Sequence, residues 1–449
     1  MSKNPFRSRV PDWDSLRGAL QDSGADRSTL EHFDEFRSRR EFFGLLGRGG
    51  AAVALTGMGA GLHATLSGLF GRGMIPVAWA QEAEDGGQPI PGKEDMTLHN
   101  QRPINGEFAP HLLDDSVTPT PNHFVRNNAL VPKRAYNQDA QGWAFEVDGE
   151  VNKPLKLTLA DLQKMPQVSM PLLIECGGNG RAFFEPPVRG NPWGRGAIGC
   201  SEWTGVRLRD VLKQAGLKNS AVYTAHYGED PPIGGAEPFS RGVPIDKAME
   251  EHTLIAYKMN GEDLHPLNGY PARVVVPGWI GSASQKWLNR ITIRDQVHDA
   301  EKMTGYSYRV PAYPVVPGSR PPEEDMEIAT EWLIKSMITR PEENTELKPG
   351  DSLQVAGHAW AGEQSVKKVE VSTDFGLNWQ EAKLRKPPNK YAWYRWESEL
   401  KFPDKGYYEI WARATDADGR TQPIRQPWNP KGYLGNLVHR VPVLVGVSA

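Results

Sequence analysis

The chain has 449 residues, which is more than a single hydrophobic core usually supports, so two or more domains are expected. Hydrophobic residues make up 39% of the chain, charged residues 24%, and the formal net charge is -3. This balance excludes a disordered chain and gives no electrostatic reason to expect binding to nucleic acid or to an anionic membrane surface.

The first 80 residues differ from the rest of the chain. A polar segment ends in SRREFF at 38–43, and a glycine-rich, weakly apolar run follows it. Arg48 and Arg72 interrupt this run, which makes a permanent membrane span costly. The pattern resembles a twin-arginine export signal with a small-residue cleavage site, Ala-Trp-Ala, at 78–80. An uncleaved interfacial helix is the alternative.

If residues 1–80 are such a signal, they are removed, and the remaining protein is periplasmic with no membrane anchor. The twin-arginine route carries proteins that are already folded. It therefore favours an enzyme that receives its cofactor in the cytoplasm before export.

Residues 81–122 are rich in proline and asparagine and show no sustained period, which predicts an extended arm. The stretch GWAFEVDGEV then alternates apolar and polar residues and turns at Asp148-Gly149, as a hairpin does. Two short helices are predicted next, in LTLADLQKMP and in EWTGVRLRDVLKQAGL. The apolar face of the second helix comprises Leu208, Val211, Leu212 and Leu217. Short helices beside strands predict an α+β domain over residues 123–325.

Two strands are predicted towards the end of this domain, one at 273–276 and one in KWLNRITI, with a loop at 279–285 between them. A proline-rich, acidic stretch near residue 320 is typical of a domain boundary. Residues 326–449 then show short alternating strands such as KKVEVSTD and YYEIWARATDADGR. They predict an all-β, immunoglobulin-like sandwich.

Cys176 and Cys200 are the only cysteines of the chain. This number excludes a four-cysteine zinc or iron-sulfur site, and the chain has no CxxCH motif for covalent haem. A disulfide between the two, or two buried small hydrophobic residues, are two interpretations. The third is a reactive or metal-binding thiolate at Cys176, because ECGGNGR supplies glycines for close backbone approach and a cation, Arg181, that favours the thiolate.

The stretch ECGGNGRAFFEPP, together with HFVRNNALVP, YGED, NGYPARVVVPG and SQK, resembles the sulfite oxidase family of molybdenum enzymes from about residue 100 to the end. Within that family, the order and spacing are most similar to the molybdenum subunits of sulfane dehydrogenases of the Sox sulfur-oxidation system. The resemblance implies a molybdopterin-binding domain followed by a dimerisation domain. It also implies one molybdenum-molybdopterin cofactor per chain and no haem on this chain.

The resemblance makes Cys176 the protein ligand of the metal and Cys200 a structural residue. Arg273 matches the family arginine that holds the pterin phosphate, a role suited to a guanidinium group. Two histidine positions of the family are Asn128 and Asn268 in this sequence. The implied cofactor-binding residues are Phe124, Val125, Arg126, Asn127, Asn128, Asp230, Asn268, Arg273, Ser284, Gln285 and Lys286.

The resemblance also implies a catalytic pocket. Its residues would be Arg126, Arg181, Trp193, Tyr306 and Lys431, with Tyr308 left open as the alternative tyrosine. Lys431 stands where the sulfite enzymes have an arginine, and a lysine binds a small planar oxyanion less specifically. The stretch FFEPPVRGNPWGRG adds an apolar, proline-stiffened rim that could dock a protein-borne substrate, unless it is a surface loop packed on itself.

The function implied is oxidation of sulfane sulfur on a carrier-protein cysteine, by oxygen-atom transfer from water, with electrons passing to a c-type cytochrome subunit. The catalytic subunit would form a homodimer core within a heterotetramer. One alternative is a sulfite dehydrogenase acting on free sulfite. Another is a non-enzymatic exported scaffold in which Cys176 and Cys200 form a disulfide.

Overall fold

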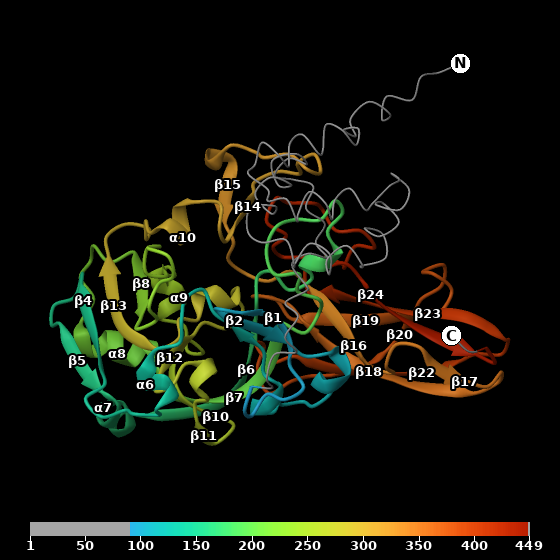
Figure 1. Ribbon diagram of the computed structural model, residues 1–449, viewed down its shortest axis with the longest axis horizontal. Coiled ribbons are helices and arrows are strands. Elements are labelled where there is room, and N and C mark those ends of the chain that lie inside the picture. The colour runs from blue at the N-terminus through green and yellow to red at the C-terminus, as the bar shows by residue number, and fades with distance from the viewer. Residues whose placement is uncertain (1–89, 448–449) are drawn as a thin grey trace, which may run out of the picture. The chain divides into compact units, whose positions relative to one another are not determined.

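The computed structural model describes residues 90–447. The predicted export signal lies outside the described residues. Strands dominate the described part (Figure 1), and its α-helices are short. These are α6 (Lys133–Tyr136), α7 (Leu159–Lys164), α8 (Leu208–Ala215), α9 (Ile245–Ala248) and α10 (Glu301–Thr304). Among residues 90–447, no helix has the length and apolar character needed to cross a membrane.

The described part of the predicted arm contains a hairpin, β1 (Thr97–Gln101) and β2 (Ile104–Glu107), followed by the 3-10 helices η3 (Pro110–Leu113) and η4 (Thr120–Asn122). Strand β2 also pairs with β3 (Val125–Arg126), with Asn105 opposite Arg126. The sequence predicted only extended chain here, because TLHNQRPINGE lacks an alternating apolar pattern. The arm thus forms a small sheet that holds Arg126.

Two five-stranded sheets form the first half of the described chain. The first has the order β11 (Glu262–Asp263), β10 (Leu254–Met259), β7 (Ile198–Arg207), β6 (Gln167–Glu175), and β12 (Arg273–Val275) also pairs with β10. The second has the order β5 (Leu155–Thr158), β4 (Ala144–Gly149), β13 (Leu288–Arg294), β8 (Tyr223–Gly228), β9 (Ser240–Arg241). One buried cluster joins both sheets to helices α7 and α8, and includes Phe145, Leu162, Leu212, Val274 and Ile291.

Local sequence explains the two predicted helices, which are both present. Helix α7 begins with a capping box, in which Thr158 Oγ1 accepts a hydrogen bond from the Asp161 amide at 3.2 Å and the Asp161 carboxylate accepts one from the Thr158 amide at 3.1 Å. Helix α8 buries Leu208, Val211 and Leu212 on one face, as their spacing predicts. It ends at Ala215 and is capped by Gly216, whose φ of 70° suits glycine, so Leu217, predicted for the same face, lies beyond the helix.

The second half is a β-sandwich, drawn in orange and red in Figure 1. One sheet has the order β16 (Lys335–Arg340), β18 (Ser352–Trp360), β22 (Tyr394–Lys401), β21 (Lys383–Arg385). The other has the order β17 (Thr345–Leu347), β24 (His439–Val445), β23 (Gly406–Asp416), β19 (Val366–Ser372), β20 (Gln380–Glu381). Both sheets contribute to one core that includes Val355, Trp396, Val369, Ile410 and Val443.

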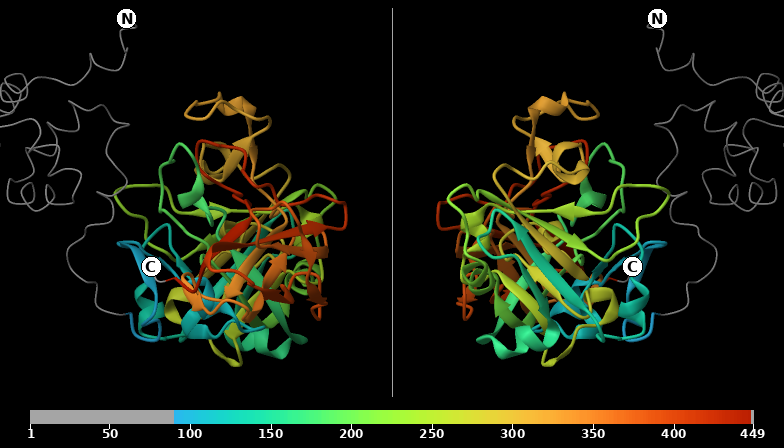
Figure 2. Two further views of the ribbon diagram at one scale, coloured as in Figure 1. Left: turned by 90° about the vertical axis from the view of Figure 1, so that its right-hand side faces the viewer. Right: turned by 90° about the vertical axis from the view of Figure 1, so that its left-hand side faces the viewer.

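A two-stranded sheet, β14 (Arg309–Pro311) and β15 (Met326–Ile328), lies between the halves in sequence. Figure 2 shows the segment that connects these strands projecting from the rest of the described chain in both views. The halves also share a buried cluster, in which Leu173 and Ile198 of the first half pack with Met337, Trp360 and Trp393 of the second. The described chain is therefore held together across its two halves by a common apolar core.

Candidate active site

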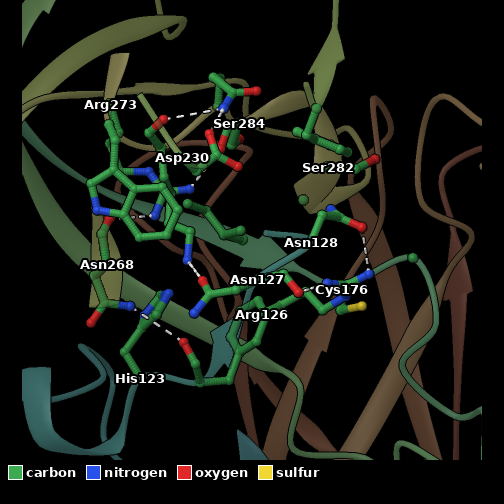
Figure 3. A pocket seen from close by; sticks show the side chains of 18 of the residues that line it. His123, Arg126, Asn127, Asn128, Cys176, Asp230, Asn268, Arg273, Ser282 and Ser284 are labelled. Carbon is green, nitrogen blue, oxygen red and sulfur yellow. Dashed lines mark hydrogen bonds between the residues drawn. The ribbon is translucent and has the colours of Figure 1, made fainter. Parts of the chain in front are cut away.

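A cavity with about 650 Å³ of unfilled space, part of it open to solvent, gathers most of the predicted cofactor residues. Its lining draws on segments far apart in the sequence: the stretch around β3, the loop after β6, the loop after β8 and the loop that precedes β13. Figure 3 shows Cys176 and Asn128 on one side of the cavity and Arg273 and Asn268 on the other. The predicted residues that line it are Phe124, Arg126, Asn127, Asn128, Cys176, Asp230, Asn268, Arg273, Ser284, Gln285 and Lys286.

Cys176 follows directly on the last residue of β6. Its amide donates a hydrogen bond to the Ala197 carbonyl at 2.9 Å, which continues the pairing of β6 with β7 by one step. The Gly178 amide points at the thiol, with N to Sγ 3.4 Å. A Cβ on Gly178 would lie 2.3 Å from Nη2 of Arg181, so any larger residue here would displace the Arg181 guanidinium. The strand thus delivers the thiol to the cavity wall on a tightly packed glycine loop.

Arg126 lies beside this thiol. It donates to Asn128 Oδ1 at 2.7 Å and to the Tyr308 hydroxyl at 3.2 Å. Burial alone would lower the pKa of Arg126, but the Tyr308 phenol and the Cys176 thiol raise it above its ordinary value. Tyr308 in turn donates to Asn128 Oδ1 at 2.9 Å. We call Cys176, Arg126, Asn128 and Tyr308 the thiol end of the cavity.

Two cations mark the opposite end. Arg273 donates to the backbone carbonyls of Asn268 and Ser284, both at 2.9 Å, and burial lowers its pKa to about 9. Lys286 donates to the Leu267 carbonyl at 2.8 Å, and its pKa lies well below the ordinary value because of burial and the nearby Arg273. An anion between them would favour both charged forms. We call Arg273, Lys286, Asp230 and Gln285 the cation end.

Asp230 is the acidic residue of the cation end. Burial raises its pKa to about 6. Gln285 Nε2 donates to Asp230 Oδ1 at 3.3 Å, and a Cβ on Gly228 would lie 2.4 Å from the same oxygen. The close approach of this backbone requires glycine and leaves Asp230 facing the cavity.

The donor set fits a molybdopterin cofactor. Several buried polar atoms of the cavity lining have no partner within the described residues, namely Asn127 Nδ2, Asn268 Oδ1, Ser282 Oγ and Gln285 Oε1. Such atoms are costly unless a ligand or water satisfies them. Within residues 90–447, no group of three or more His, Cys, Asp or Glu side chains gathers as a metal site. A metal at Cys176 would therefore need further ligands from the cofactor itself, as a dithiolene supplies them.

The remaining predicted residues do not line this cavity. Val125 is buried in β3. Trp193 is buried against His99, with ring centroids 4.8 Å apart. Arg181 donates to the backbone carbonyls of Lys431 and Asn191, both at 2.9 Å, and lies over the Tyr433 ring at 5.2 Å. The predicted pocket residues Arg181, Trp193 and Lys431 are thus not among the residues that line the cavity.

Tyr308, and not Tyr306, is the tyrosine of the cavity. Tyr306 instead donates to the Pro321 carbonyl and packs under Arg320, whose guanidinium lies 4.6 Å from the ring centroid. Residue 308 has a φ of 62°, a left-handed conformation that sequence alone does not reveal. The structure thus brings Tyr308, and not Tyr306, into the cavity lining, and the catalytic role of either tyrosine stays a prediction.

Sequence reasoning missed His123, Phe239, Ser282 and Trp287, which also line the cavity. His123 is buried, its Nδ1 lies 3.1 Å from Ser201 Oγ, and burial together with nearby cations holds its pKa well below the ordinary range. It directly precedes the predicted segment 124–128, and Ser282 precedes the predicted segment 284–286, so adjacency was the available signal. Trp287 directly follows the segment 284–286 and offered the same signal. Phe239 offered none, because an apolar side chain in a cavity wall cannot be told from a core residue by sequence.

Cys200 and Cys176 are both free and buried. Strand pairing places Cys200 opposite Leu173, three residues before Cys176. Three residues of strand span about 10 Å, which is beyond the reach of a disulfide. The disulfide interpretation is therefore wrong, and with it falls the scaffold that depended on this bridge.

The apolar rim after Cys176 lies partly against the sandwich. Phe183 is 40% exposed and lies under the Arg195 guanidinium at 4.6 Å, while Trp428 Nε1 donates to the Pro186 carbonyl at 2.8 Å. A second groove, with about 1210 Å³ of unfilled space, is bordered by Phe183, Ile424 and Trp428 among others. The rim therefore combines packed and exposed apolar surface.

The fold and the cavity define a molybdopterin oxidoreductase. Residues 131–302 match the oxidoreductase molybdopterin binding domain, and residues 326–446 match the Mo-co oxidoreductase dimerisation domain. The chain belongs to the sulfite oxidase family. Residues 123–130 precede the first matched range, although Arg126 and Asn128 supply part of the thiol end.

Similarity to individual proteins agrees with this assignment. The chain is 34% identical to mitochondrial sulfite oxidase of Rattus norvegicus over 370 residues, which cover 78% of this chain and 66% of the relative. It is 32% identical to sulfite oxidase of Gallus gallus over 386 residues, covering 80% and 81%. The match thus spans slightly less than two thirds of the rat enzyme.

Among solved structures, the chain is similar to the sulfane dehydrogenase SoxCD from Paracoccus pantotrophus. The TM-score is 0.66 with 26% sequence identity, covering 80% of this chain and 91% of that one. The predicted closeness to the molybdenum subunit of sulfane dehydrogenase, SoxC, is thereby confirmed at the level of fold and family.

Proposed function

We propose that this chain is the catalytic subunit of a sulfane dehydrogenase, which oxidises sulfane sulfur bound to a carrier-protein cysteine and passes the electrons to a c-type cytochrome. The observation that carries the proposal is that one cavity holds both the Cys176 thiol with Arg126 and the two cations Arg273 and Lys286. The similarity to sulfane dehydrogenase SoxCD supports the choice of substrate class.

The cofactor, when bound, supplies two-electron oxygen-atom transfer from water to sulfur. Cys176 would hold the metal, while Arg273 and Lys286 would hold the anionic tail of the pterin. At the thiol end, Arg126 donates to Asn128 Oδ1 and to the Tyr308 hydroxyl, and Tyr308 donates to the same Asn128 oxygen, so the guanidinium is fixed in direction. A fixed cation stabilises negative charge that develops on a reacting oxygen.

The surroundings of Lys431 support a sulfane substrate over free sulfite. Two N–H groups of Arg181 donate to backbone carbonyls, and Arg181 lies outside the cavity lining. By the family resemblance, Lys431 stands where the sulfite enzymes have an arginine. Burial and the neighbouring Arg181 also lower the pKa of Lys431. A pocket with fewer bidentate cations holds a small dianion less tightly.

A side-by-side assay tests the substrate. The purified holoprotein is mixed with a c-type cytochrome and with either free sulfite or a carrier protein that bears a sulfane sulfur, and cytochrome reduction is followed. We expect kcat/KM for the loaded carrier to exceed that for sulfite by about tenfold or more. Faster turnover with sulfite would contradict the proposal, and purified protein without molybdenum would contradict both activities.

Oxidation of free sulfite is the second candidate, because identities of 32% and 34% to sulfite oxidases favour it. The dimerisation-domain match supports a homodimer core, which a cytochrome subunit would extend to a heterotetramer. A monomeric mass in light scattering would contradict that assembly. Export to the periplasm by residues 1–80 belongs to the same proposal, and fractionation of cells that express the full chain tests it.

A further inference from the structure

A buried ion pair joins the sandwich to the residue just before Cys176. Glu175 ends β6 and is fully buried, and Lys335, the first residue of β16, forms an ion pair with its Oε1. The Trp360 indole N–H donates to the other carboxylate oxygen, Oε2, at 2.8 Å. Both oxygens of Glu175 are therefore bound by side chains of the sandwich.

The same network continues into the glycine loop. Asn179 Nδ2 donates to Glu175 Oε1 at 3.0 Å, and Lys335 Nζ donates to the Asn179 carbonyl at 3.4 Å. The Asn179 amide donates to the Cys176 carbonyl at 2.9 Å, and Asn179 Oδ1 accepts from the Ala197 amide at 3.1 Å. Residues on both sides of Cys176 are thus fastened to one buried lysine.

From this network, we propose that Lys335 and Trp360 are positioning residues, which fix the direction of the Cys176 thiol through Glu175 and Asn179. The inference rests on the proposed function in taking Cys176 as the metal ligand. Gly177, Gly178 and Gly180 leave the loop with high intrinsic backbone freedom, so its geometry needs an external restraint. A buried ion pair is weak evidence for stability, because apolar residues of similar volume often replace it at no cost.

Lys247 offers a matched control. It is as buried as Lys335 and also bridges the halves, with its Nζ 2.6 Å from Glu250 and 2.7 Å from Glu363. Its partners include the Tyr391 hydroxyl but no residue of the 176–180 loop. Lys335→Met and Lys247→Met therefore both remove a buried ammonium group, but only Lys335 contacts the 176–180 loop.

Two readouts that need no substrate separate positioning from stability. The full chain is compared by hydrogen exchange at the amides of residues 179–181 and, after removal of the cofactor, by the rate at which iodoacetamide labels Cys176. We expect Lys335→Met to speed both by about tenfold, with labelling of the deeply buried Cys200 as an internal reference. We expect Lys247→Met to lower the unfolding temperature while leaving both readouts unchanged.

Equal changes in the two variants, or no change in Lys335→Met, would overturn the inference. If Lys335→Met does not fold, Trp360→Phe decides, since it removes one N–H donor and keeps most of the ring. We expect it to speed exchange of the same amides by about threefold, and an unchanged rate in the folded variant would overturn the inference as well. Neither readout uses a sulfur substrate, so failure of the sulfane assay leaves them interpretable, and their failure leaves the sulfane proposal standing.

Discussion

The thiol end and the cation end of the cavity are built in different ways. At the thiol end, Arg126, Asn128 and Tyr308 satisfy one another through side-chain hydrogen bonds. At the cation end, Arg273 donates to backbone carbonyls, Lys286 donates to the Leu267 carbonyl and to Asn127 Oδ1, and burial lowers the pKa of both residues. The hydrogen bonds at the thiol end fix the directions of its side chains. At the cation end, the two positive charges of Arg273 and Lys286 face only one carboxylate among the described residues that line the cavity, that of Asp230. An elongated ligand with a reactive head and an anionic tail satisfies both.

Removal of the thiol breaks the thiol end most severely. We expect Cys176→Ser to lower turnover with any sulfur donor by a factor of about 10³ or more, because the protein ligand of the metal is lost. Cys200→Ser is the control, since burial raises the pKa of that thiol to about 12 and it lies outside the cavity lining. Elemental analysis and the cytochrome assay measure both variants. Full activity of Cys176→Ser would contradict the assignment of Cys176 as the protein ligand of the metal.

A substitution at the cation end should weaken binding of the cofactor and leave the kcat of enzyme that carries the cofactor unchanged. We expect Arg273→Gln to lower molybdenum content after dialysis about tenfold, since a charge-assisted bond is worth about 1.5 to 3 kcal/mol. Arg195→Gln is the control, because Arg195 is also held by backbone carbonyls, those of Leu437 and Val438, but lies outside this cavity. Residual enzyme that carries the cofactor should keep its kcat. A lowered kcat with unchanged metal content would assign Arg273 to the thiol end instead.

The two ends also differ in how far the sequence predicts them. Contiguous motifs predicted the cation end well, because 284–286 and Arg273 lie on short segments whose neighbours in sequence are also neighbours in space. The thiol end depends on Arg126 meeting Cys176 through a small sheet formed by the arm, and pairing between short polar strands leaves no periodic signal. The strands of the sandwich and the helices α7 and α8 were predictable, because each is encoded by a hydrophobic pattern within its own few residues.

Substitution of Tyr306 and of Tyr308 tests which of the two tyrosines acts at the thiol end. We expect Tyr308→Phe to lower kcat about tenfold or more, because the hydroxyl that accepts from Arg126 and donates to Asn128 Oδ1 is lost and the guanidinium is held less firmly. Tyr306→Phe should change kcat less than twofold, roughly, since its hydroxyl bonds only to the Pro321 carbonyl among the described residues. Steady-state kinetics of both variants measure the difference. An equal loss in the two, or a larger loss in Tyr306→Phe, would restore the original preference.

The prediction for Asp230 concerns the stability of the cofactor-free protein and not turnover or cofactor content. Burial raises its pKa from 3.8 to about 6, so folding favours the neutral acid. Stability from this source is fully present below about pH 4 and is lost as pH rises towards 6. Asp230→Asn should therefore become more stable than the parent protein over this window, by about 3 kcal/mol at most above pH 6.

Urea unfolding of the two proteins at several pH values measures this difference, and Asp161→Asn supplies the contrast. The hydroxyl and amide of Thr158 lower the pKa of Asp161, so its contribution is present at neutral pH and is lost on acidification. The two substitutions should thus change stability with opposite sign as pH rises. A flat difference for Asp230→Asn would mean that Lys286 already neutralises the carboxylate in the folded protein, and the cation end would then carry less free positive charge for an anion.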